Sequence, residues 1–150
     1  MAAIISAVDL LEKRGITAAQ DGRKPLITVI STTGISDKHR DVPYLLYPLY
    51  HALLRTPHAD KRKMEAFLFQ DGGVHFRDFV IVRPTLLWDN EPYGVDKVAA
   101  GWEWGVKKGE EAGPKMGYTI GRRDVGEWTF QNVIQGEGCE GKCYSLCYKS

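Results

Sequence analysis

The sequence has few of the features that mark secreted, membrane or disulfide-rich proteins. It contains three cysteines among 150 residues, and an odd number without an export signal argues against a disulfide framework. The most apolar run, residues 42–54, is interrupted by proline and is too short for a bilayer, which takes roughly 20 residues. The N-terminal segment has neither the positive start nor the cleavage site of a secretory signal. We therefore expect a cytoplasmic protein with no membrane partner.

The charges are balanced and dispersed along the chain. Lysine and arginine number 20 and aspartate and glutamate 19, which gives a net charge of +1. No basic stripe stands out, so nucleic acid is a poor candidate for a partner. Hydrophobic residues make up 43% and charged residues 26%, a composition typical of folded proteins. The length is close to that of one domain, and we expect residues 1–150 to form a single domain.

Common motifs of hydrolases and metal sites are also missing. There is no G-x-S-x-G and no His-x-x-x-His, and the four histidines are scattered at His39, His51, His58 and His75. Cys139, Cys143 and Cys147 are evenly spaced, but no fourth cysteine or histidine follows them. Residues 142–148 alternate like a strand that places Cys143 and Cys147 on one face. This pattern favours small buried residues over a metal site.

The hydrophobic pattern predicts helices that alternate with apolar strands. The predicted helices are Ala2–Arg14, Asp41–Leu54 with a kink at Pro48, a helix from Thr56 to about Gln70, and residues 121–134. The predicted strands are Leu26–Ile30, residues 78–84, 101–104 and 117–120, and Lys142–Tyr148. The strand Leu26–Ile30 is continuously apolar, which is typical of a parallel strand covered on both faces. The predicted class is α/β with a mostly parallel sheet and flanking helices.

Three segments carry a resemblance to a known family. They are LITVISTTGIS at residues 26–36, KRKMEAFL running into DFVIVRPTLL, and YTIGRRDVGEW at residues 118–128. In this order and spacing they resemble the C-terminal half of atypical and extended short-chain dehydrogenase/reductase proteins, closest to the NAD(P)-binding, NmrA-like and epimerase-like proteins of fungi. The resemblance implies a partial Rossmann-type sheet and NADP or NAD as cofactor, with an unknown small molecule as substrate.

In this family a glycine-rich turn holds the cofactor pyrophosphate, and no G-x-x-G-x-x-G or G-x-G-x-x-G follows a predicted strand in this sequence. Such a turn follows a strand and opens a helix, where backbone N–H groups and the helix dipole bind negative charge. The pair Gly72–Gly73 follows a predicted helix and precedes a strand, which is the wrong order. We therefore expect a fold without the N-terminal glycine-rich βαβ unit, as a truncated gene product or as a half-domain with another purpose.

The resemblance implies a set of cofactor-binding residues. Lys61 matches the lysine that holds the nicotinamide ribose and is the single candidate for a catalytic residue. Its tyrosine partner, four positions earlier, is replaced by Pro57, and Tyr47 and Tyr50 lie outside that spacing. The other candidate cofactor contacts lie where two predicted strands end: Ser31, Thr32, Thr33, Pro84, Thr85 and Leu86.

Each of these residues also has a purely structural interpretation. Lys61 can be an exposed helical lysine near Glu65, and hydroxyls after a strand often cap a turn. Arg83 can belong to a structural ion pair, and Pro84 can simply end a strand. The other conspicuous residues are interpreted as structural: Arg123 and Asp124 as a pair at a helix start, and Trp102, Trp104 and Trp128 as core or interface residues.

Two functions of different classes follow. The first is a truncated or atypical NAD(P)-binding protein of the short-chain dehydrogenase/reductase type, either an oxidoreductase or a nucleotide sensor. The second is a non-catalytic or vestigial interaction protein that associates with itself through the open edge of its sheet. The second hypothesis rests on the physical cost of an exposed sheet edge and predicts a homo-oligomer.

Overall fold

The computed structural model describes residues 1–16, 22–46, 55–89 and 91–149. Within these ranges the main sheet has four strands in the order β1-β2-β6-β4. β1 (Leu26–Ile30), β2 (Asp78–Pro84) and β6 (Lys142–Tyr148) run parallel, and β4 (Val98–Trp104) pairs antiparallel with β6. The mostly parallel α/β sheet that the sequence predicts is therefore confirmed. β1 and β4 are the two edges of this sheet.

A second, two-stranded sheet continues from the first. β3 (Leu86–Trp88) begins two residues after β2 ends, and it pairs parallel with β5 (Thr119–Gly121). β5 leads directly into α4 (Arg122–Thr129), whose last turn widens into a π-helical turn at Phe130–Ile134. The carboxyl end of β2 itself lies between β1 and β6, with which it pairs.

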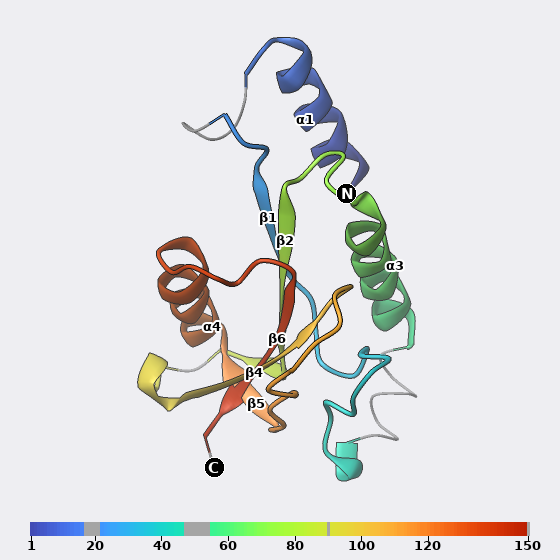
Figure 1. The fold of residues 1–150 in the computed structure, drawn as a ribbon. Coiled ribbons are helices and arrows are strands. Elements are labelled where there is room, and N and C mark those ends of the chain that lie inside the picture. Colours follow the sequence, from blue (N-terminus) through green and yellow to red (C-terminus); the bar gives the residue numbers. More distant parts are fainter. Residues whose placement is uncertain (17–21, 47–54, 90, 150) are drawn as a thin grey trace.

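Helices cover both faces of the main sheet. Figure 1 shows α3 (Arg55–Asp71) and α4 on opposite sides of it, with α1 (Ala2–Lys13) near the amino end of β1. Alternation along β2 explains the two layers, because successive side chains of a strand point to opposite faces. Phe79 and Ile81 pack with Leu68 of α3, whereas Val80 and Val82 pack with Trp128 on the α4 side. No helix among the described residues is long and apolar enough to cross a membrane.

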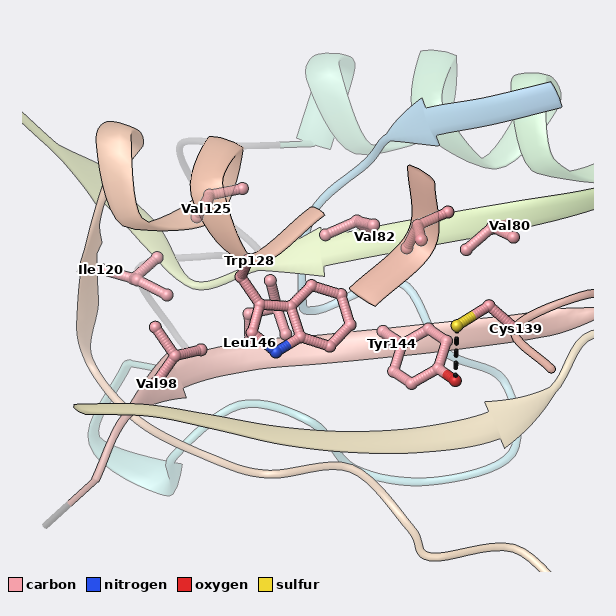
Figure 2. Packing of buried hydrophobic residues seen from close by; sticks show 10 residues of the cluster. Val80, Val82, Val98, Ile120, Val125, Trp128, Cys139, Tyr144 and Leu146 are labelled. Atoms are coloured by element: carbon pink, nitrogen blue, oxygen red, sulfur yellow. Dashed lines mark hydrogen bonds between the residues drawn. The ribbon is translucent and has the colours of Figure 1, made fainter. Parts of the chain in front are cut away.

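The core beneath α4 is the larger of the two clusters. Figure 2 shows Trp128 beside Leu146 and Tyr144, and the rings of Trp128 and Tyr144 are 5.1 Å apart between centroids. The buried hydroxyl of Tyr144 donates a hydrogen bond of 3.3 Å to Cys139 Sγ, drawn as a dashed line. Burying aromatic side chains of this size supplies much of the apolar area that stabilises such a layer.

The predicted helix Asp41–Leu54 is wrong over its described part. Residues 41–43 are irregular and only a short 3₁₀ turn forms at Tyr44–Leu46, while residues 47–54 lie outside the described residues. The reason is a contact with the preceding loop, since Asp41 Oδ1 accepts the N–H of Gly34, seven residues earlier, at 2.9 Å. Asp41 is thereby held against the preceding loop, in a position that a helical turn starting there would not give it.

Other predicted elements are confirmed with small shifts in their ends. The turn after α3 uses Gly72 and Gly73 at φ of 55° and 88°, which glycine adopts without steric penalty. The strand predicted at residues 101–104 begins earlier, at Val98, because it follows β6 along its whole length. Gly121 is the N-cap of α4, as predicted.

Candidate functional site

The carboxyl ends of β1 and β2 lie side by side, and the chain continues their pairing for a few residues. Ser31 N–H donates to Val82 O at 2.7 Å, and Thr33 N–H donates to Pro84 O at 3.1 Å. Thr85 N–H donates in turn to Leu146 O at 3.0 Å. These bonds fix the backbone of both segments at the edge where parallel α/β sheets bind their ligands.

Two hydroxyl groups at this edge have no hydrogen-bond partner among the described residues. Ser31 Oγ and Thr85 Oγ1 are both buried; Ser31 as a whole is 5% exposed and Thr85 is 2% exposed. A buried hydroxyl without a partner is costly, and such groups are expected where a ligand or water completes the site. Thr33 differs, because its Oγ1 donates a hydrogen bond of 3.5 Å to Pro84 O at the end of β2.

Lys61 reaches this same edge from α3. Its ammonium donates a hydrogen bond of 2.9 Å to Ile30 O, the last residue of β1 and the neighbour of Ser31. The structural interpretation near Glu65 does not describe its contacts, since the Glu65 carboxylate is occupied by Arg83. The helix therefore delivers a positive charge to the end of β1.

The predicted site residues divide into two groups. Six lie at the carboxyl ends of β1 and β2, namely Ser31, Thr32, Thr33, Lys61, Pro84 and Thr85. Leu86, the residue after Thr85, begins β3 and is 51% exposed. Pro57 stands in the first turn of α3, one turn before Lys61, and its side chain has no group that can transfer a proton. Tyr47 and Tyr50 lie outside the described residues.

Next to this edge is a buried ion cluster that the sequence did not reveal. Arg83 donates from Nε to Glu65 Oε1 at 3.0 Å and from Nη2 to Glu65 Oε2 at 2.6 Å, and Nη1 donates to Glu103. All three residues are 5% exposed or less. Burial alone would lower the pKa of Arg83, but the hydrogen bonds and charges of the two carboxylates raise it, so the guanidinium stays protonated. Ser36 Oγ donates to both oxygens of Glu103.

The structural interpretation of Arg83 is thus supported, although its partners come from distant elements. Glu65 lies on α3 and Glu103 on β4, and only the register of three strands brings the latter to Arg83. The spacing of Lys61 and Glu65 on one helix was visible in the sequence. No local signal identified Glu103, because its neighbours are two tryptophans that suggest only an apolar strand.

The loop after β1 encloses a hollow of about 400 Å³ beside the ion cluster. Its walls come from residues 34–44 and from Arg62 of α3. Asp41 forms part of this wall and is 4% exposed. Burial raises the pKa of Asp41 to about 6, against the opposing effects of the Gly34 N–H and Arg83.

Asp124 holds the second sheet to the first. Its carboxylate accepts the N–H groups of Tyr93 and Gly94 at 2.9 and 3.0 Å and the hydroxyl of Tyr148 at 2.6 Å. Burial would raise the pKa of Asp124, but these three hydrogen bonds lower it below its usual value. The structural interpretation of these two residues is supported for Asp124, whereas Arg123 is exposed and its Nη1 lies 3.9 Å from Glu91 Oε2.

The tryptophans divide between core and surface layers. Trp128 is buried in the cluster under α4. Trp102 and Trp104, two residues apart on β4, contact each other edge to face at 5.0 Å between centroids. Lys142 Nζ lies 4.4 Å from the centroid of Trp102. These contacts agree with the interpretation of the tryptophans as packing residues.

The three cysteines do not converge on one point. Cys143 belongs to the cluster under α3, whereas Cys139 belongs to the cluster under α4. No group of three or more histidine, cysteine, aspartate or glutamate side chains in the described ranges is placed to hold a metal ion. All three thiols are free and buried, as the alternating pattern of the last strand predicts for Cys143 and Cys147.

Comparison with known proteins gives relatives and a fold. No family model matches the chain. Reductase pytE of Aspergillus terreus is 36% identical over 156 aligned positions, which cover 97% of this chain and 54% of that protein. Oxidase pynE of Aspergillus niger is 43% identical over 119 positions, which cover 74% of this chain and 40% of that protein. The chain therefore spans about half the length of the curated relatives it matches.

The fold matches that of a larger solved protein. A short-chain dehydrogenase/reductase of Veillonella parvula, solved in complex with NADP, superimposes with a TM-score of 0.60 at 15% identity. The match covers 97% of this chain and 57% of that one. The described elements therefore correspond to about half of such a fold.

Proposed function

We propose that this chain, whose fold matches about half of a short-chain dehydrogenase/reductase solved with NADP, forms the nicotinamide end of an NAD(P)-dependent oxidoreductase or nucleotide sensor. The observation that carries this proposal is the position of Lys61. Its ammonium lies 2.9 Å from the carbonyl that ends β1, beside the unpartnered hydroxyl of Ser31. We propose residues 1–150 as one such domain, with NADP or NAD as its ligand.

The residues present fit one end of a dinucleotide. Ser31 Oγ and Thr85 Oγ1 are hydroxyls that can donate and accept, and a ribose or carboxamide offers both kinds of partner. The pyrophosphate needs a turn of backbone N–H groups at a helix start. The one G-x-G-x-x-G of the sequence, residues 136–141, follows a helical turn and precedes the strand β6, which is the wrong order. The fit therefore supports binding of the nicotinamide ribose and not of the whole cofactor.

The cofactor, when bound, supplies or accepts a hydride. In this proposal Lys61 holds the ribose hydroxyls through its positive charge, and Ser31 and Thr85 orient the nicotinamide side. Pro57 provides no proton, so a transfer to substrate oxygen requires another acid. The names of the two relatives, a reductase and an oxidase, are consistent with hydride transfer in either direction.

The test compares the two halves of the cofactor as separate probes. Reduced nicotinamide mononucleotide should perturb the purified chain in saturation-transfer NMR at millimolar concentration, whereas adenosine 2′,5′-bisphosphate should not. Lys61→Ala should weaken nicotinamide mononucleotide by about tenfold, equivalent to ~1.4 kcal/mol. A thermal melt establishes beforehand that each protein unfolds cooperatively.

Lys63→Ala is the matched control, since Lys63 is an exposed lysine of the same helix. It should bind the probe as the parent chain does. Equal binding of the two cofactor halves, or a Lys61→Ala chain that binds normally, would remove the proposal.

A second candidate function follows from the edge strand. Among the described strands β1 pairs only with β2, and Ile30 at its end is 41% exposed. Beside it a largely apolar hollow of about 460 Å³ is lined by Ile30, by Leu87, by Val125 of α4, and by Phe130 and Ile134 of the π-helical turn that follows α4. Exposed strand edges and contiguous apolar surface are usually covered in native proteins. We propose that a second copy of this chain covers this edge where no other protein segment does.

A further inference from the structure

The hollow enclosed by residues 34–44 has chemistry of its own, separate from the end of β1. It measures about 400 Å³, within the range of small-molecule sites. The loop supplies most of its wall, and Arg62 of α3 closes it. Buried hydrogen bonds hold both sides of the wall. On the α3 side Glu65 accepts from Arg83, and on the loop side Asp41 accepts the N–H of Gly34.

Asp41 is the unusual group in this wall. Oδ1 accepts the N–H of Gly34 at 2.9 Å, but Oδ2 is buried and has no hydrogen-bond partner among the described residues. The residue is 4% exposed, so water does not compensate its charge freely. A buried carboxylate oxygen without a partner is costly, and a ligand that donates to it regains that free energy.

The charges behind Asp41 favour a cationic donor. Arg83 is the single guanidinium in the buried cluster, and it is shared by the carboxylates of Glu65 and Glu103. Arg83 and Glu103 both act electrostatically on Asp41. When Asp41 is ionised, three carboxylates therefore share one positive charge. An ammonium group placed at Asp41 Oδ2 reduces this excess, whereas a neutral hydroxyl leaves it unchanged.

The outer wall carries the opposite charge. Lys38 and His39 are both bound to Glu111, at 3.1 and 3.0 Å, and are thereby held away from a ligand. Arg40 instead stacks on the ring of Tyr44, with its guanidinium carbon 3.5 Å from the centroid. In the described part of the chain neither Arg40 nor Arg62 forms an ion pair. Both can therefore donate to a carboxylate of the ligand, which guanidinium groups bind in a bidentate manner.

We propose that this hollow binds a zwitterionic ligand of the α-amino acid class. Its ammonium donates to Asp41 Oδ2, its carboxylate binds Arg40 and Arg62, and an apolar or aromatic side chain lies against Tyr44. The site does not depend on whether the chain binds NADP or NAD. It uses none of the residues that form the proposed nicotinamide site.

Four probes that share a phenyl ring on a two-carbon chain test the proposal by isothermal calorimetry. They are L-phenylalanine, N-acetyl-L-phenylalanine, L-phenyllactate and phenethylamine. L-Phenylalanine should bind at least tenfold more tightly than the acetylated and hydroxy analogues, which lack the ammonium, and also more tightly than phenethylamine, which lacks the carboxylate. Equal binding of phenylalanine and phenyllactate, or no binding of phenylalanine at millimolar concentration, overturns the proposal.

A pair of variants assigns the ammonium contact. Asp41→Asn keeps the side-chain shape and the oxygen that accepts from Gly34, and it should weaken phenylalanine at least tenfold while leaving phenyllactate unchanged. Asp37→Asn removes an exposed carboxylate from the same wall and should leave both probes unchanged. If Asp41→Asn binds phenylalanine like the parent chain, the proposal is wrong. The comparison of the four probes on the parent chain decides it even where a variant fails to fold.

Discussion

Arg83 and Glu65 are joined by two parallel hydrogen bonds, Nε to Oε1 at 3.0 Å and Nη2 to Oε2 at 2.6 Å, in the buried layer between β2 and α3. This bidentate geometry is the strongest form of ion pair between side chains. Glu103 brings β4 into the same contact. One guanidinium thus links a central strand, a covering helix and an edge strand, and it lies beside both proposed binding sites.

Replacing Arg83 by methionine should strongly destabilise the protein. The substitution leaves two buried carboxylates without a cation, and removing one partner of a buried ion pair costs about 3–5 kcal/mol. Urea unfolding followed by circular dichroism measures this change. Arg77→Met is the matched control, because Arg77 makes a partly exposed contact of 3.9 Å to Glu140 and a long hydrogen bond of 3.5 Å to Lys24 O, and it should lose less than about 1 kcal/mol. A loss of under about 1 kcal/mol in Arg83→Met would mean that the cluster is not ionised.

The sequence predicted this region in part, and the reason lies in the range of each interaction. β2 with Arg83 and α3 with Glu65 were both predicted, because each follows from a local pattern of apolar residues. The position of Glu103 depends on the register between β4 and β6 and between β6 and β2. Such pairing connects residues far apart in the chain, and it has no signature in a local window.

The helix predicted at Asp41–Leu54 is wrong over residues 41–46, because its first residue is held by a contact that a helical pattern does not show. The apolar spacing and Pro43 suggest a helix start, but the bond from Gly34 to Asp41 and the burial of Asp41 favour an irregular loop. Conversely, the resemblance placed Ser31, Lys61 and Thr85 at one edge of the sheet, and the structure brings these residues to the ends of adjacent strands. Their role in cofactor binding stays a prediction.

The thiols should react slowly in the native protein. Burial raises the pKa of Cys143 to about 12 and also raises that of Cys147, so neither carries thiolate at neutral pH. Cys139 is 8% exposed and donates to Asn132 O at 3.2 Å. We expect 5,5′-dithiobis(2-nitrobenzoate) to label none of the three thiols within minutes at about pH 8. In about 6 M guanidinium chloride, where burial is lost, it should label all three. Rapid labelling of Cys143 in buffer would contradict the described packing of β6.

Asp41 should make stability fall as the pH rises through the range of its titration. Its pKa in the folded state, about 6, lies above the usual 3.8, so the folded protein binds this proton more tightly than the unfolded chain. The cost of ionising it is absent below about pH 4 and complete above about pH 6, where the shift corresponds to about 3 kcal/mol. Arg83 reduces this cost and Glu103 increases it.

The variant Asp41→Asn isolates this contribution. It should be more stable than the parent chain by up to about 3 kcal/mol at pH 8, and the difference should vanish near pH 4. Urea titrations of both proteins at about pH 4.5, 6 and 8 measure this difference in stability. The contributions of the other carboxylates are the same in both proteins and cancel in the comparison. A difference independent of pH would show that Asp41 ionises without cost. The same variant should lose phenylalanine binding, a pairing of gained stability and lost affinity that a purely structural role does not produce.

The last prediction tests whether the chain self-associates through the open edge of β1. Ile30 is 41% exposed beside the apolar hollow formed with Leu87 and α4, so a charge at this position should oppose a second copy. Sedimentation velocity at about 50 µM, a concentration at which weak dimers form, tests this. The parent chain should sediment as a dimer and the Ile30→Lys variant as a monomer. Val74→Lys places the same charge on the exposed turn after α3 and should leave the dimer intact. A parent chain that sediments as a monomer rules out self-association as its function and leaves the nicotinamide site as the remaining proposal.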